Sequence, residues 1–317
     1  MAEEKVYTPT RDDFTPVAAD SSTREAIARP SISFWKDAMT RLWNNRTAIV
    51  CVIILGLIVL GALVIPLVSP YTTSEQHVAH SNASFMFRDS ADGHLHIFGT
   101  DNLGRDMFVR VWDGARVSLF IAVLAVAINL VIGLLYGGIS GYFGGGVDTV
   151  MMRIVEIVNG IPYLIIVIIL MMVLPRGLIS IVVAYGIVGW TGMARLVRGQ
   201  IVSLKEQEFI VAAEAMGARS GRIILRHLLP NTLSVIIVNI TLAIPNVIFS
   251  ESFLSFVGIG LPPPQPSWGV LASEGQKVFQ MYPLQLIVPS VFICLTMLSF
   301  NLLGDAMRDA FDPKLRR

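Results

Sequence analysis

The chain is poor in charged residues and in cysteine. Only 15% of its 317 residues are charged, whereas an average soluble domain has about 25%. A net charge of +1 provides no basic surface of the kind that nucleic acids require. Cys51 and Cys294 are the only cysteines and both lie in apolar runs, which excludes a disulfide-built secreted protein. A hydrophobic fraction of 54% also excludes a mainly disordered chain.

The apolar residues are gathered into long blocks without Asp, Glu, Lys or Arg, such as 47–74 and 278–304. These blocks reach or approach the roughly 20 residues that cross a bilayer as a helix. Lipid gives the backbone no hydrogen-bond partner, and the runs do not alternate as barrel strands do. We therefore predict an all-α membrane protein with six transmembrane helices, at 48–69, 117–138, 152–174, 178–197, 232–256 and 284–304.

The distribution of lysine and arginine predicts the orientation. With the N-terminus in the cytoplasm, the inner segments hold 18 of the 24 Lys and Arg residues and the outer segments hold 6, as the positive-inside rule requires. Residues 1–30 contain no apolar core of a cleavable signal peptide. We expect a flexible cytoplasmic tail at 1–33, an interfacial amphipathic helix at 34–46, an extracytoplasmic loop at 70–115, a permease domain of five further helices at 116–304 and a cytoplasmic tail at 305–317.

A group of histidines and a run of glycines could indicate a metal site and a phosphate site, but neither has the pattern that such a site requires. Four histidines lie in the predicted outer loop (His77, His80, His94 and His96), but their spacing matches no structural zinc pattern, so we expect solvated side chains and no metal. The glycine run at 137–146 has no Lys and follows a predicted membrane helix; we interpret it as an inner turn. No phosphate-binding Gly-x4-Gly-Lys-Ser/Thr motif occurs in the chain.

Several polar residues lie within the apolar blocks. Asparagines at 129, 159 and 239 fit hydrogen bonds between helices, which are worth well under about 2 kcal/mol each. Polar groups in a membrane are costly and often line a pathway. Glu251, near the outer end of the fifth predicted helix, and Asn246 are therefore our candidate pathway or gate residues.

The inner segment at 198–231 has the pattern of a cytoplasmic helix-turn-helix. Residues 205–216 predict one helix, Gly217 a break and 220–229 a second helix, and Pro230 then precedes the next membrane helix. A basic group of Arg219, Arg222 and Arg226 lies beside apolar residues that would suit the docking of a partner: Phe209, Ile210, Ala213, Met216, Ile223, Ile224 and Leu228.

This segment resembles the EAA loop of ABC-importer permeases through Val211–Ala212–Ala213, Gly217 and the run from His227 to Asn231. Val211 stands where the family pattern has Glu, and Glu208 and Glu214 lie nearby, so the carboxylate contact is either lost or relocated. The resemblance implies the following residues for coupling to an ATPase: Glu208, Ala212, Ala213, Gly217, His227, Leu229 and Pro230.

Three further segments (98–119, 254–269 and 301–313) resemble those of dipeptide and oligopeptide permeases, most closely the C-type subunit of oligopeptide importers. The resemblance implies a bacterial cytoplasmic-membrane protein that forms half of a translocation path with a second related permease. It also implies an extracytoplasmic peptide-binding protein and two cytoplasmic ATPases that hold ATP and Mg, with no cofactor and no enzymatic activity in this chain. A dipeptide or nickel importer and an ion-gradient-driven secondary transporter are the alternatives.

Overall fold

The computed structural model describes residues 34–312 apart from 89–92, 94 and 176. The predicted tail at 1–33, His94 and the end of the predicted tail at 305–317 lie outside these residues. The helices are α1 (Phe34–Asn44), α2 (Arg46–Val68), α3 (Met107–Phe143), α4 (Gly145–Gly160), α5 (Tyr163–Val173), α6 (Leu178–Val188), α7 (Trp190–Lys205), α8 (Glu208–Ala215), α9 (Ser220–Ile223), α10 (Leu229–Phe256), α11 (Trp268–Lys277) and α12 (Leu284–Phe311). A 3₁₀ turn at Val78–His80 and a two-stranded antiparallel ribbon, β1 (Phe87–Arg88) with β2 (Leu95–His96), lie between α2 and α3.

The helices confirm the all-α membrane fold. Among the described residues, five helices are long and apolar enough to cross a membrane, and they include α6–α7 as Leu178–Lys205 and α9–α10 as Ser220–Phe256. The pair α4–α5 makes a sixth if it is counted as one span, but it is bent by 79°. The continuous helix predicted at 152–174 is therefore wrong. Ile161 is extended (φ −93°, ψ 126°) before Pro162, as expected because proline disfavours helix in the residue before it.

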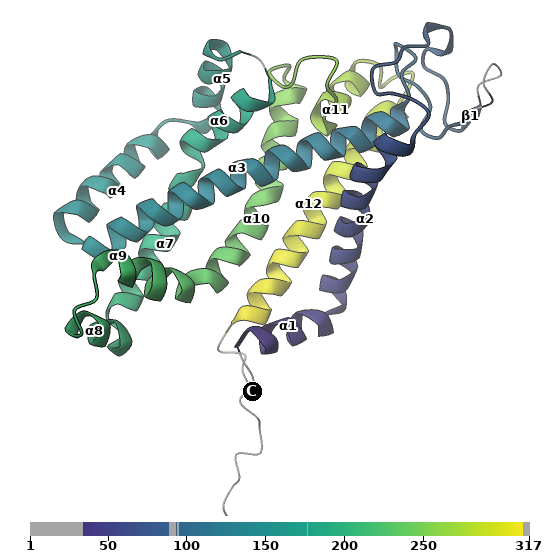
Figure 1. Ribbon diagram of the computed structural model, residues 1–317. Coiled ribbons are helices and arrows are strands. Elements are labelled where there is room, and N and C mark those ends of the chain that lie inside the picture. The colour runs from purple at the N-terminus through teal and green to yellow at the C-terminus, as the bar shows by residue number, and fades with distance from the viewer. Residues whose placement is uncertain (1–33, 89–92, 94, 176, 313–317) are drawn as a thin grey trace, which may run out of the picture.

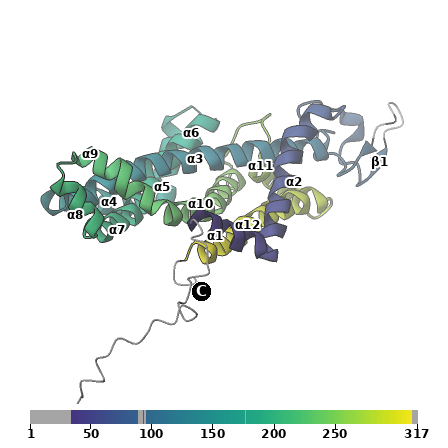
Figure 2. The same ribbon diagram turned by 60° about the horizontal axis from the view of Figure 1, so that its bottom comes forward.

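The two ends of the molecule differ (Figure 1). The loop with β1 and helix α11 lies at one end, and α8, α9, α1 and the C-terminal end of α12 lie at the opposite end. Figure 2 shows that α8 and α9 are far from α1 along the length of the molecule, and that α1 lies beside α12. This grouping agrees with the orientation predicted from lysine and arginine.

Helix α3 is much longer than the predicted 117–138. It begins at Met107, inside the predicted outer loop, where the Asp106 carboxylate accepts the Val109 N–H at 2.8 Å as an N-cap. It ends at Phe143, so most of the glycine run is helical, and the predicted turn there is wrong. The true turn is shorter and occurs at Gly144 and Gly145, whose φ angles are +64° and +52°.

Glycines spaced by four on α3 form a closely packed seam against α7. Gly133, Gly137 and Gly141 lie on one face, and a Cβ added at Gly137 would overlap the Ala194 carbonyl and lie 2.9 Å from the Val197 Cβ. Small residues at this spacing let two membrane helices approach closely. The seam fixes α7 on α3, and α7 leads directly into the segment that carries α8.

Candidate functional site

Helix α8 begins two residues after α7 and has a well-defined end. Gly217 has a φ of +79°. The Gly217 N–H donates to the Glu214 carbonyl at 2.9 Å and the Ala218 N–H to the Ala213 carbonyl at 3.1 Å. This is the Schellman arrangement, in which glycine adopts the left-handed conformation that ends a helix. The break predicted at Gly217 is confirmed.

One face of α8 is buried in the chain and the other is open. Ile210 and Ala213 are buried, and Ile210 packs in a cluster with Tyr142 and Ile201. Of the predicted coupling residues, Glu208, Ala212, Gly217 and Pro230 are exposed, His227 and Leu229 are half-buried, and Ala213 faces the interior. The small Ala213 side chain therefore lets α8 pack on its own chain, while the other residues remain available in part or in full.

The open face combines apolar and basic groups. We define the coupling surface as the exposed residues Phe209, Val211, Met216, Arg219, Arg222, Leu225 and Arg226. Met216 is the most exposed of the apolar members, at 83%. A surface that exposes such side chains beside three arginines has the composition of a protein docking surface.

The second helix of this segment does not end before the membrane helix. Ser220–Phe256 runs as one continuous helix, so the predicted division into a helix at 220–229 and a separate membrane helix at 232–256 is wrong. Residues Ile224–Leu228 form a π turn, in which the Leu229 N–H donates a hydrogen bond to the carbonyl of Ile224, five residues earlier. Proline lacks an N–H and clashes with the carbonyl four residues before it, and the widened turn accommodates both defects. The part of the coupling surface formed by Arg222, Leu225 and Arg226 thus lies on the same helix as α10.

The acidic residues near the altered motif position have different environments. Val211, which stands where the family pattern has Glu, is 56% exposed. The Glu214 carboxylate accepts the Tyr142 hydroxyl at 3.1 Å, and Lys205 Nζ donates to the Tyr142 carbonyl at 2.7 Å. Glu208 is exposed and forms no ion pair with a described residue. Glu208 is therefore the carboxylate that is free to meet a partner.

Glu251 lies inside the chain. Its side chain is fully buried, and it accepts hydrogen bonds from the hydroxyls of Ser118 (3.1 Å), Ser255 (3.0 Å) and Ser267 (2.7 Å). These serines come from α3, from α10 itself and from the residue that caps α11. Sequence reasoning missed them, although all three lie in or beside the family-like motifs. Glu251 joins three elements in this structure, and its role as a gate stays a prediction.

The asparagines have separate environments. Asn159 accepts the Thr191 hydroxyl at 3.0 Å, a bond between α4 and α7 that confirms the prediction for this residue. Asn246 is exposed, and its amide donates to the Leu242 carbonyl of its own helix at 3.0 Å. Asn239 lies on the same face of α10 and lines an open cavity. Its predicted bond between helices is absent among the described residues.

A buried ionic network joins the outer loop to α3 and α11. Arg105 Nε lies 2.6 Å from the Asp101 carboxylate, and Arg110 contacts both Asp101 and Glu274, the latter at 2.9 Å. Asp101, Arg105 and Arg110 are at most 4% exposed. Buried charges must be paired in this way because an unpaired one is very costly. The network holds the loop rigidly on the end of the helices.

His96 contradicts the prediction of solvated loop histidines. It is fully buried, lies 2.8 Å from the Asp106 carboxylate and stacks on Tyr71 with ring centroids 4.4 Å apart. Burial raises the pKa of Asp106, while the bonds from Val109 and His96 act in the opposite direction. His96 therefore belongs to the packed base of the loop.

The chain is similar to membrane components of transport systems. Residues 130–317 match the family model described as "Binding-protein-dependent transport system inner membrane component", and residues 33–84 match "N-terminal TM domain of oligopeptide transport permease C". It is 46% identical over 304 residues to the oligopeptide transport system permease protein OppC of Bacillus subtilis (strain 168), covering 96% of this chain and 97% of that protein. It is 46% identical over 294 residues to the dipeptide transport system permease protein DppC of the same strain, covering 92% and 90%. A solved structure of the MetNI methionine ABC transporter in inward-facing conformations matches 62% of this chain and 96% of that chain, with 19% identity and a TM-score of 0.49.

Proposed function

Because the chain belongs to the family of binding-protein-dependent transport-system inner-membrane components, we propose that it forms one half of the translocation path of an oligopeptide importer. It is a multi-pass inner-membrane protein of bacteria, a permease that works with ATPase and binding-protein partners. In the proposed complex a second related permease completes the path, two ATPases bind ATP and Mg at the cytoplasmic face, and the binding protein delivers the peptide.

The observation that carries the oligopeptide assignment is the match of residues 33–84 to the N-terminal domain of oligopeptide permease C. A dipeptide substrate is the second candidate, since the identity to the dipeptide permease is also 46%. Both candidates assign the same mechanical role to the chain and differ in the length of the peptide.

The coupling surface supports the division of labour between subunits. Closure of an ATPase pair can drive transport only if it favours one permease conformation over another. Force applied at Arg222 and Arg226 is passed to α10 without a break, because Ser220–Phe256 is one helix. Glu208, on the first turn of α8, takes the role of the carboxylate that Val211 no longer supplies.

The test is uptake by the reconstituted complex of this chain, its partner permease, the ATPases and the binding protein in proteoliposomes. We expect uptake of a labelled alanine pentapeptide that requires ATP and is unaffected by a proton ionophore. Uptake without ATP that the ionophore abolishes would establish a secondary transporter. Pentapeptide uptake that a tenfold excess of dialanine fully suppresses would favour the dipeptide candidate, and uptake of nickel alone would overturn both.

A further inference from the structure

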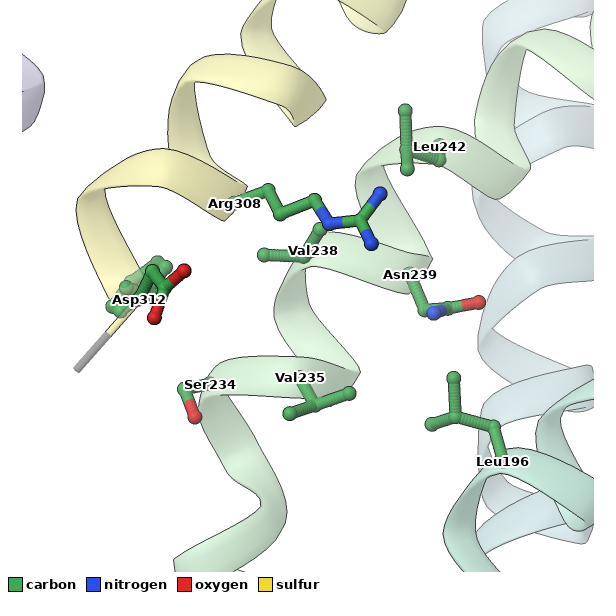
Figure 3. Close-up of a pocket in the computed structure, with 9 residues that line it drawn as sticks. Leu196, Ser234, Val235, Val238, Asn239, Leu242, Arg308 and Asp312 are labelled. Carbon is green, nitrogen blue, oxygen red and sulfur yellow. The ribbon is translucent and has the colours of Figure 1, made fainter. Parts of the chain in front are cut away.

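An open cavity of about 410 Å³ lies between α7, α10 and α12 (Figure 3). It is at the end of the molecule where α8 and the C-terminal end of α12 lie, which the charge distribution assigns to the cytoplasm. Leu196, Val235, Val238 and Leu242 form an apolar wall, and Ser234, Asn239 and Arg308 add polar groups. Figure 3 shows the Arg308 side chain extending from α12 toward α10, with Asp312 on the opposite side of the cavity from Asn239.

Three of the polar side chains that line this cavity have no hydrogen-bond or ion-pair partner within the described part of the chain. Arg308 forms no ion pair there, and the side chains of Ser234 and Asn239 form no hydrogen bond. Arg308 is exposed, whereas Ser234 and Asn239 are half-buried. Polar groups on membrane helices are costly when unsatisfied and usually face water or a ligand. The open cavity therefore presents these three polar groups to water or to a ligand.

The residues of α10 that line the cavity belong to a row that continues along the helix. Val235, Asn239, Leu242 and Asn246 follow one another at intervals of three or four residues, so they lie on one side of the helix. Asn246, our candidate pathway residue, is exposed at the upper end of this row. A molecule that moves along this face toward the cytoplasmic end would reach Arg308 last.

We propose that this cavity binds the C-terminal carboxylate of the peptide in transit, with Arg308 as its counter-charge; the proposal rests on the proposed function. Guanidinium binds carboxylate through paired, charge-assisted hydrogen bonds. The Asn239 amide matches a peptide group, and the aliphatic wall accepts a side chain.

The experiment compares an alanine pentapeptide with the same peptide carrying a C-terminal amide. Initial uptake rates are measured in the complete reconstituted complex with binding protein preloaded to equal occupancy by each peptide. We expect the wild-type protein to transport the free acid about tenfold faster, the effect of one charge-assisted bond. Arg308→Gln should lower the free-acid rate to the amide rate and leave the amide rate unchanged, and Arg308→Lys should keep part of the preference.

Matched variants separate this role from others. Arg153→Gln removes the same charge from an exposed ion pair on α4 and should keep the wild-type ratio. Asn239→Asp places a carboxylate in the cavity with Arg308 and should lower the ratio by competing for the guanidinium; it tests the site even if Arg308 variants fail to assemble. An unchanged ratio in both Arg308→Gln and Asn239→Asp would overturn the proposal.

Other outcomes of the same experiment would indicate a structural role for Arg308, a lipid headgroup in the cavity or failure of the proposed function. Equal slowing of both peptides by Arg308→Gln would overturn the proposal and indicate a structural role. The same equal slowing only in vesicles that contain phosphatidylglycerol, and not in pure phosphatidylcholine, would assign the cavity to a lipid headgroup. If the wild-type complex takes up neither peptide, the proposed function itself fails, whereas uptake without discrimination refutes only the carboxylate site.

Discussion

Replacing Gly217 with Val is expected to uncouple ATP hydrolysis from peptide uptake, because the backbone of this residue cannot keep its conformation. A Cβ at Gly217 would meet no heavy atom within 4 Å, so the side chain itself meets no obstacle in the chain. The φ of +79°, however, costs an ordinary residue about 1–2 kcal/mol. The cost is higher for a β-branched residue such as valine. That cost is a factor of roughly 5–30 in a conformational equilibrium. The alternative is to open the turn and lose its two closing bonds of 2.9 and 3.1 Å.

The matched control is Gly217→Asn, since asparagine tolerates the left-handed conformation much better than valine. The measurement is the amount of peptide taken up per ATP hydrolysed by the reconstituted importer. We expect Val to lower this ratio at least about fivefold and Asn to keep most of it. An equal loss with Val and Asn would refute the reasoning, because it would show that the partner needs the open space above Gly217 rather than its backbone conformation.

Two further predictions concern packing and buried charge. Gly137→Ala should lower the thermal unfolding midpoint of the purified complex, since overpacking costs about 1–3 kcal/mol, whereas Gly146→Ala, with open space around its Cβ, should not. Arg110→Met should sharply reduce the yield of folded protein, because breaking a buried pair costs about 3–5 kcal/mol. Arg116→Met removes an exposed pair and should change the yield little; equal yields of the two variants would contradict a stabilising role for the network around Asp101.

The membrane spans were predictable because the bilayer imposes length and composition on every helix that crosses it. Whether a helix breaks or continues at a proline was not predictable. At Pro162 the preceding residue is extended and the helix breaks, but at Pro230 the helix continues through a π turn. The local rule against proline is the same at both sites. Neighbouring packing decides which way it is satisfied, and Leu228 beside Pro230 is fully buried in the cluster around α7.

The candidate sites were predictable to the extent that they depend on spacing along the chain. The break at Gly217 and the open face of α8 follow from the motif. The spacing of Gly133, Gly137 and Gly141 was visible, but glycine suits both a turn and a close helix contact. Glu251 and Arg110 bind partners that are far away in the sequence. No local sequence pattern predicts which distant hydroxyl or carboxylate will pair with a buried polar side chain.

The coupling surface and the proposed carboxylate site share one helix, and this links their motions. Helix α10 begins as a continuation of the coupling segment and forms one wall of the cavity that contains Arg308. Its contacts with α12 are close at this level: the Thr241 hydroxyl lies 3.5 Å from the Met307 sulfur, and Gly304 leaves room for Leu242. A tilt of α10 relative to α12 or α7, driven from Arg222, would change the separation of the cavity walls. On this mechanism the ATPases would open and close the carboxylate site directly, so that the peptide is held in one conformation and released in the other.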